Sequence, residues 1–165
     1  MKKTALAIAV LLALANLFVI TELFGWRNDP LYLFYYSEIK KDEEKLKLYA
    51  DQLCNKLTNS INSLKCRKYK FKVVVFHPVL YWDKTVADGN LLTHVGRVRK
   101  IAIDNLNEDE IKFILAHELA HYLFNTLNED MANRFATEMT SAETKHSVFK
   151  KMCQMLHIQP IDCVS

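Results

Sequence analysis

Apolar residues recur at steps of three and four from Ser37 to about Leu64, which is the spacing of one face of an α-helix. The apolar positions are Leu46, Tyr49, Ala50, Leu53, Leu57, Ile61 and Leu64. The stretch has an acidic start and contains neither glycine nor proline. The pattern therefore predicts one long helix before any strand.

Three short segments that follow have the composition or alternation of β-strands. Residues 71–76 are rich in β-branched side chains, and residues 98–103 alternate between apolar and polar positions. Residues 80–86 are a candidate for a further strand, with Asp88-Gly89 as the turn after it. Together these segments predict a small antiparallel or mixed sheet that lies between helices.

A second helix is predicted from Asn107, whose side chain can cap the first turn. Glu110 stands three residues later, so the pair has the spacing of a capping box. Apolar residues follow at helical spacing until the pattern fades at Asn125. The signals at both ends agree, and they predict a helix of about four turns.

A third helix is predicted after a short turn, with Thr126 or Asn128 as its cap. The helical pattern continues, with a break near Ser141, toward Leu156. Helices therefore stand on both sides of the strand segments. This order predicts an α+β fold with a long N-terminal helix, a small sheet and two helices packed on it.

The beginning of the chain has the charge pattern of a membrane or export segment. Lys2 and Lys3 precede an uncharged run over residues 4–21. A cleaved signal peptide has an apolar region of about 7–15 residues, and residues 13–15 offer the small side chains of a cleavage site. The apolar run continues through residues 17–20, and about 18 apolar residues just reach across a bilayer. We favour a retained signal anchor over a cleaved signal peptide.

Both interpretations divide the chain in the same way, into a targeting segment over residues 1–25 and a single domain over residues 26–165. Both also place the two lysines in the cytoplasm and the domain outside it, as a periplasmic or extracellular domain. The domain is then membrane-anchored, or secreted if the segment is removed. A buried apolar helix of a cytosolic protein fits the terminal lysines less well.

Composition adds to this picture by excluding some partners. Half of the 165 residues are apolar, which is enough for one compact core, and the net charge is only +3. The positive charge is mild and spread along the chain, so we expect no nucleic-acid partner.

The four cysteines are Cys54, Cys66, Cys153 and Cys163. Outside the cytoplasm they can form two disulfides, and the short separations favour 54 with 66 and 153 with 163. Buried free thiols are the alternative, and the pairing itself stays open. No CxxC spacing is present, so we expect no cysteine zinc site.

The candidate chemistry lies on the helix that Asn107 starts. His117 and His121 are four residues apart, so their side chains lie on one face of a helix, one turn from each other. Two imidazole nitrogens at this spacing can hold one zinc ion at about 2.0–2.1 Å. Glu118 stands beside the first histidine, where it can take a proton from zinc-activated water and pass it to a leaving amine. The sequence predicts a Zn²⁺ cofactor and hydrolysis without a covalent intermediate.

A catalytic zinc ion needs a third protein ligand and an open fourth position. Glu129 starts the third predicted helix, and Asn133 lies one turn further on the same face, where it can orient a ligand histidine. Glu138 is the rival ligand, because it would face His117 in a helical hairpin. His146 is a possible stabiliser of the transition state. The pattern alone does not choose between the carboxylates.

Residues 107–121 resemble the active-site helix of gluzincin peptidases, which have a zincin-like domain. The resemblance extends to two groups, the CAAX-prenyl-peptidase and heat-shock-peptidase family and the ImmA/IrrE-like family. In both, a later helix carries a glutamate with a pattern that residues 129–133 match, and residues 135–139 resemble the ImmA/IrrE continuation. The resemblance covers residues 98–140. It implies that His117, His121 and Glu129 are the zinc ligands and that Glu118 is the general base.

Three functional hypotheses follow. The first is a zinc-dependent peptidase that acts on protein or peptide substrates and is held at a membrane by its N-terminal segment. The alternative is a membrane-tethered binding module with a structural or relic metal site. A third is a small envelope protein, encoded by a host or a phage, in which the helices serve assembly only.

Overall fold

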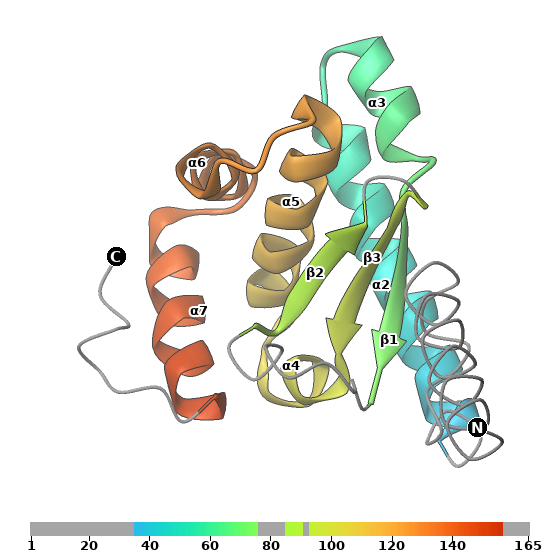
Figure 1. Cartoon of the computed structure of the whole chain (residues 1–165), viewed down its shortest axis with the longest axis vertical. Helices are drawn as coiled ribbons and strands as arrows, with labels where there is room; N and C mark the ends of the chain where they lie inside the picture. Colours follow the sequence, from blue (N-terminus) through green and yellow to red (C-terminus); the bar gives the residue numbers. More distant parts are fainter. Residues whose placement is uncertain (1–34, 76–84, 91–92, 157–165) are drawn as a thin grey trace, which may run out of the picture.

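The computed structural model describes residues 35–75, 85–90 and 93–156 of the chain. Figure 1 shows a small sheet with α2 and α5 against it and with α6 and α7 beyond α5. The helices are α2 (Tyr36–Lys56), α3 (Ser60–Cys66), α4 (Lys100–Asn105), α5 (Glu108–Phe124), α6 (Glu129–Met139) and α7 (Ala142–Met155). The strands are β1 (Lys70–Val74), β2 (Ala87–Asn90) and β3 (Val95–Arg99). The predicted α+β fold is confirmed. His117, Glu118 and His121, which form an HExxH motif, lie on α5, and Glu129 begins α6.

The sheet is mixed, as one of the two predicted arrangements required. The strand order is β1-β3-β2, with β1 parallel and β2 antiparallel to the central strand β3. In the antiparallel pair, Asp88 lies opposite Arg97 and Gly89 lies opposite Gly96. Strand β2 therefore forms one edge of the described sheet, on the side of α5 (Figure 1).

The predicted single helix over residues 37–64 is wrong in one respect, because it is broken into α2 and α3. The chain turns extended at Leu57, and the side chain of Asn59 accepts hydrogen bonds from the backbone N–H groups of Ile61 and Asn62. The apolar period runs through the break, but Ile61 and Leu64 are 64% and 65% exposed. The first helix ends at Leu57, and Asn59 caps the start of the second, whose apolar residues no longer meet the core.

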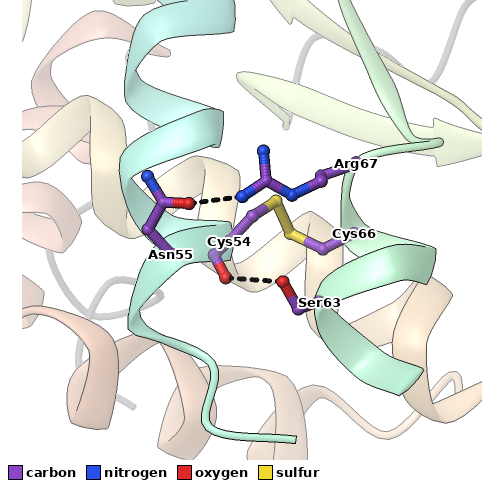
Figure 2. Close-up of a disulfide and its surroundings, with 5 residues drawn as sticks. All are labelled: Cys54, Asn55, Ser63, Cys66 and Arg67. Atoms are coloured by element: carbon purple, nitrogen blue, oxygen red, sulfur yellow. Dashed lines mark hydrogen bonds between the residues drawn. A yellow bond between two sulfur atoms is a disulfide. The ribbon is translucent and has the colours of Figure 1, made fainter. Parts of the chain in front are cut away.

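A disulfide joins the two helices of this hairpin. Cys54 on α2 and Cys66 at the end of α3 are bonded, as predicted (Figure 2). Beside it, the Ser63 hydroxyl donates to the Cys54 carbonyl at 3.3 Å, and Arg67 donates to the Asn55 side chain at 2.5 Å. The second predicted pair joins Cys153 to residue 163, which lies outside the described residues.

Two expectations for the sheet are also wrong. Residues 100–103 are part of helix α4 and not of a strand, because Lys100 pairs with Asp104 one turn later while Ala102 and Ile103 point into the core. Asp88-Gly89 is not a turn, because both residues lie inside β2 and pair across to β3. Most of the strand predicted over residues 80–86 lies outside the described residues, because residues 76–84 are not among them.

Helix α5 is the centre of the core, since it contacts α2, the sheet, α6 and α7. It is buried around most of its circumference, including Ile111, Phe113, Ile114, Leu115, Ala116, Leu119, Ala120 and Leu123. Ala116 and Ala120 are fully buried, and their small side chains allow the neighbouring elements to approach closely. The functional motif is therefore carried by the most enclosed helix of the described fold.

Among the described residues, no helix has both the length and the apolar character needed to cross a bilayer. The predicted targeting segment over residues 1–25 lies outside them.

Candidate metal centre

The position of α5 is defined at its start by the predicted capping box. The Asn107 side chain accepts from the Glu110 backbone N–H at 3.0 Å, and the Glu110 carboxylate accepts from the Asn107 N–H at 2.7 Å. Glu110 also accepts from the Ser147 hydroxyl at 2.6 Å and pairs with Lys151 at 2.7 Å, both on α7. Glu110 thus ties α7 to the first turn of α5.

The electrostatics of Glu110 follow from these contacts. Burial works to raise the pKa of this carboxyl, because only 2% of the residue is exposed. The hydrogen bonds from Lys151, Ser147 and the Asn107 N–H outweigh burial and hold the pKa below its usual value. Glu110 is therefore a charged, fully partnered group at the base of the motif helix.

At its other end α5 stops in a tight turn that the motif histidine helps to build. Asn125 adopts the left-handed conformation, with φ 48° and ψ 51°, and its N–H donates to the His121 carbonyl. The Thr126 N–H donates to the same carbonyl at 3.1 Å. The Asn128 side chain then caps α6 by accepting from the Met131 N–H at 2.9 Å. Only seven residues separate His121 from Glu129, and this turn lets the short connection bring Glu129 back over the histidine.

Both histidines are oriented through their Nδ1 atoms. His117 Nδ1 lies 2.9 Å from Asn133 Oδ1 on α6, and His121 Nδ1 lies 2.8 Å from the Thr126 carbonyl oxygen. Each acceptor favours the tautomer with the proton on Nδ1, so that each Nε2 carries a lone pair. The two Nε2 atoms are 3.1 Å apart and point to the same place. Asn133 lies behind His117, on the Nδ1 side of its ring.

The carboxylate of Glu129 completes the group. One oxygen lies 3.1 Å from His117 Nε2 and the other lies 3.5 Å from His121 Nε2. The three ligand atoms lie within 4.8 Å of one another. Zinc–ligand bonds of about 2.0–2.1 Å in tetrahedral geometry place neighbouring ligand atoms roughly 3.3 Å apart. Two nitrogens and one carboxylate at these separations can hold a metal ion without rearrangement of the backbone.

The protonation of His117 suits this purpose. Burial lowers its pKa and prevails over the nearby negative charge of Glu129, while His121 acts in the same direction as burial. A histidine ligand must be neutral to offer its lone pair. The environment of His117 therefore prepares it to bind a metal near neutral pH.

Glu118 lies against the sheet and not in open solvent. Only 8% of the residue is exposed, and its Oε2 atom approaches Gly89 so closely that a Cβ there would lie 3.1 Å away. Burial, followed by the negative charges of Asp88 and Glu129, raises the pKa of Glu118 to about 8. A bound divalent cation would act against this shift, because its positive charge favours the carboxylate.

The histidines, Glu118 and Glu129 line one cavity of about 640 Å³ between β2, α5, α6 and α7. Thr85 to Gly89 of the β2 segment also line it. The apolar wall of the cavity consists of Phe113, Ile114, Val148, Phe149 and Met152. The cavity thus places a polar centre beside a large apolar wall.

Glu138 and His146 are exposed and do not line the cavity. Their predicted roles, as the rival third ligand and as a stabiliser of the transition state, receive no support from this geometry. The group that can hold a metal in the described part of the chain contains Glu129 and not Glu138.

The residues of β2 contribute to the site in a way that the sequence did not predict. Asp88 lines the cavity and forms a paired contact with Arg97, whose Nε lies 2.8 Å from Asp88 Oδ1. Arg97 is buried, and its partner Asp88 is the member of the pair that reaches the cavity. Asp88-Gly89 has the composition of a turn, and only the pairing with β3 shows otherwise.

Comparison with known proteins finds a similarity to a peptidase family over the part of the chain that contains this site. The family model of peptidase family M48 matches residues 87–157, which begin at β2 and extend past the end of α7. Searches of the curated proteins and of the solved structures gave no significant match. The match includes every residue that lines the cavity except Thr85 and Val86. The similarity of this part of the chain to peptidase family M48 supports a metallopeptidase, and the residues that could hold its metal lie on α5 and α6.

Proposed function

We propose that this protein is a zinc-dependent peptidase that hydrolyses peptide bonds with water activated by Glu118. The observation that carries the proposal is the convergence of His117 Nε2, His121 Nε2 and the Glu129 carboxylate beside a buried glutamate. This set of two imidazoles and one carboxylate, with a glutamate that is not a ligand, is typical of catalytic zinc sites. Similarity to peptidase family M48 over the same residues supports it.

The roles of the side chains follow from their positions. When bound, zinc supplies a Lewis acid and lowers the pKa of a coordinated water to about 7. Glu118 accepts the proton of the attacking water and returns it to the nitrogen of the leaving amine. Asn133 and the Thr126 carbonyl keep the two rings in the orientation that zinc requires.

The cavity also indicates how a peptide would lie. Strand β2 is an edge of the described sheet and lines the cavity, so an extended peptide can add to the sheet next to the metal. The apolar wall formed with Phe149 and Met152 suits a large apolar side chain beside the scissile bond. We therefore propose unfolded or extended polypeptides as the substrate class.

The decisive variant is Glu118→Gln in the full-length protein. We expect one zinc per chain in both proteins, measured by elemental analysis, and cleavage of an unfolded protein substrate by the wild type alone. The amide cannot accept the proton of the attacking water, but it leaves the three ligands in place. A Glu118→Gln protein with wild-type activity would contradict the mechanism, and a zinc-free wild type would favour a binding module with a relic site.

The third ligand is tested by a matched pair of changes on α6. Glu129→Gln should lower zinc affinity at least tenfold, because it removes the charged ligand. Glu138→Gln makes the same chemical change on the same helix, at an exposed position outside the cavity, and should leave zinc affinity unchanged. The reverse result in a chelator competition assay would assign the ligand to Glu138.

We also propose that the domain acts outside the cytoplasm, tethered or exported by residues 1–25. The Cys54–Cys66 disulfide supports this location, since such bonds persist in oxidising compartments. Fractionation of cells that express the full chain, with protease added to intact cells or spheroplasts, tests it. A domain that stays protected inside the cytoplasm would overturn the proposal.

A further inference from the structure

Tyr69 precedes β1 and has a buried hydroxyl that makes no hydrogen bond among the described residues. Only 5% of the residue is exposed. Its ring packs against Tyr122 of α5, with centroids 4.7 Å apart, and against the edge of Phe71 at 5.1 Å. A buried donor without a partner destabilises the fold, because it has lost its hydrogen bonds to water. A tyrosine at this position therefore calls for a partner for its hydroxyl.

Two glycines make room for this ring. Gly89 on β2 and Gly96 on β3 lie directly opposite each other in the antiparallel pair. A Cβ on Gly96 would lie 2.7 Å from Phe71 Cε1 and 2.9 Å from Tyr69 Cε1, and a Cβ on Gly89 would lie 2.5 Å from the Tyr69 hydroxyl oxygen. Atoms that are not bonded do not come so close, so side chains at these two positions would collide with Tyr69. Glycine at both positions leaves a passage at β2 and β3 that the Tyr69 ring occupies.

The passage leads to Glu118. The same Cβ position on Gly89 would be 3.1 Å from Glu118 Oε2, so the hydroxyl and the carboxylate both lie next to one point in space. The two groups also interact electrostatically. Burial and then the negative charge of Glu118 raise the pKa of Tyr69 far above its ordinary value, which keeps the phenol protonated and able to donate.

We propose that Tyr69 is a positioning residue whose hydroxyl, unbonded in the described structure, turns to donate a hydrogen bond to the carboxylate of Glu118 in the active protein. This inference rests on the proposed peptidase function. One carboxylate oxygen is then held by the phenol, and the other is left for the attacking water. Tyr69 does not line the cavity, so it acts on the reaction only through Glu118. Gly89 is the residue that permits the contact.

The first test is Tyr69→Phe in the full-length zinc protein, which removes one oxygen atom and keeps the ring. We expect kcat to fall about ten- to a hundredfold, the range seen when the partner of a site residue is removed, with KM and zinc content unchanged. Tyr49→Phe is the matched control, because Tyr49 is a similarly buried tyrosine, on α2 and away from the cavity. It should keep the wild-type kcat. A Tyr69→Phe protein with wild-type kcat would overturn the proposal.

The second test does not depend on activity or on zinc. The thermal midpoint of the metal-free protein is measured for Tyr69→Phe, Glu118→Ala and the double variant. If the hydroxyl bonds to Glu118, Tyr69→Phe lowers the midpoint in the presence of Glu118 and lowers it less in its absence. Additive shifts would overturn the contact. A wild type without zinc or cleavage would instead refute the peptidase function, so the two failures are distinguishable.

Discussion

At the scale of single residues, the candidate metal centre depends on which nitrogen of each histidine ring is already hydrogen-bonded. Asn133 Oδ1 and the Thr126 carbonyl each accept at Nδ1, and this leaves both Nε2 atoms for a metal. The sequence spacing predicted that Asn133 would lie behind a ligand histidine. It did not predict the partner of His121, because a backbone carbonyl leaves no trace in the residue types.

A prediction at this scale concerns Asn133→Ala. Loss of the acceptor frees the His117 ring to rotate and to change tautomer, so zinc affinity should fall about ten- to a hundredfold. Asn133→Asp keeps an acceptor and should retain most of the affinity. Competition with a chromogenic chelator measures both. An alanine variant with unchanged affinity would show that packing alone orients His117.

At the scale of elements, local patterns predicted helices well where caps and apolar spacing agreed. Helix α5 has both, and its start and end lie where the capping box and Asn125 placed them. Residues 98–103 alternate as a strand would, but only their first part belongs to β3. Ala102 and Ile103 are consecutive buried residues on one side of a helical turn, whereas Ile101 is exposed, and so short an apolar run does not discriminate between a strand and a helix.

A prediction at the element scale concerns Glu110→Gln, which weakens both the cap of α5 and its link to α7. The free energy of unfolding at pH 7 should fall by about 2 kcal/mol, since a cap is worth about 1 kcal/mol and the buried charged contacts add to it. Urea unfolding measures this. Glu108→Gln is the control, because Glu108 is an exposed residue in the same turn, and it should have a much smaller effect.

The pH dependence of this effect has a definite sign. The folded-state pKa of Glu110 is lowered, so its charge stabilises the fold fully above the unfolded-state pKa of about 4.3. That stability is lost as the pH falls through the folded-state pKa. The difference between the wild type and Glu110→Gln should therefore shrink in acid. A difference that stays constant down to pH 2 would contradict the proposed charged contacts.

At the scale of the whole molecule, the described fold divides into a hairpin that is held by a covalent bond and a site that is held by packing. The disulfide closes the α2–α3 hairpin, whereas the residues that could hold a metal lie on α5 and α6. The two parts meet where α2 packs on α5. Stability and metal binding should therefore respond differently to loss of the disulfide.

The corresponding prediction is that Cys54→Ser with Cys66→Ser lowers the free energy of unfolding by about 3 kcal/mol. This is the loop-closure value for cysteines separated by 12 residues. Zinc affinity at a temperature where the variant stays folded should remain unchanged. Urea unfolding and chelator competition measure the two quantities. A large loss of zinc affinity in the folded variant would show that the hairpin supports the site.

The sequence by itself determined helix α5 with its caps and the start of α6. Helix α5 carries three of the four residues of the candidate site, His117, Glu118 and His121. These features depend on contacts between residues three or four apart, which repeat in any helix. Only the tertiary structure decided that Glu129 rather than Glu138 meets the histidines, because that depends on the left-handed turn at Asn125. It also decided that Gly89 and Tyr69 lie beside Glu118. Those residues meet through strand pairing between distant segments, and the register of such pairing is set by the packing of the whole domain.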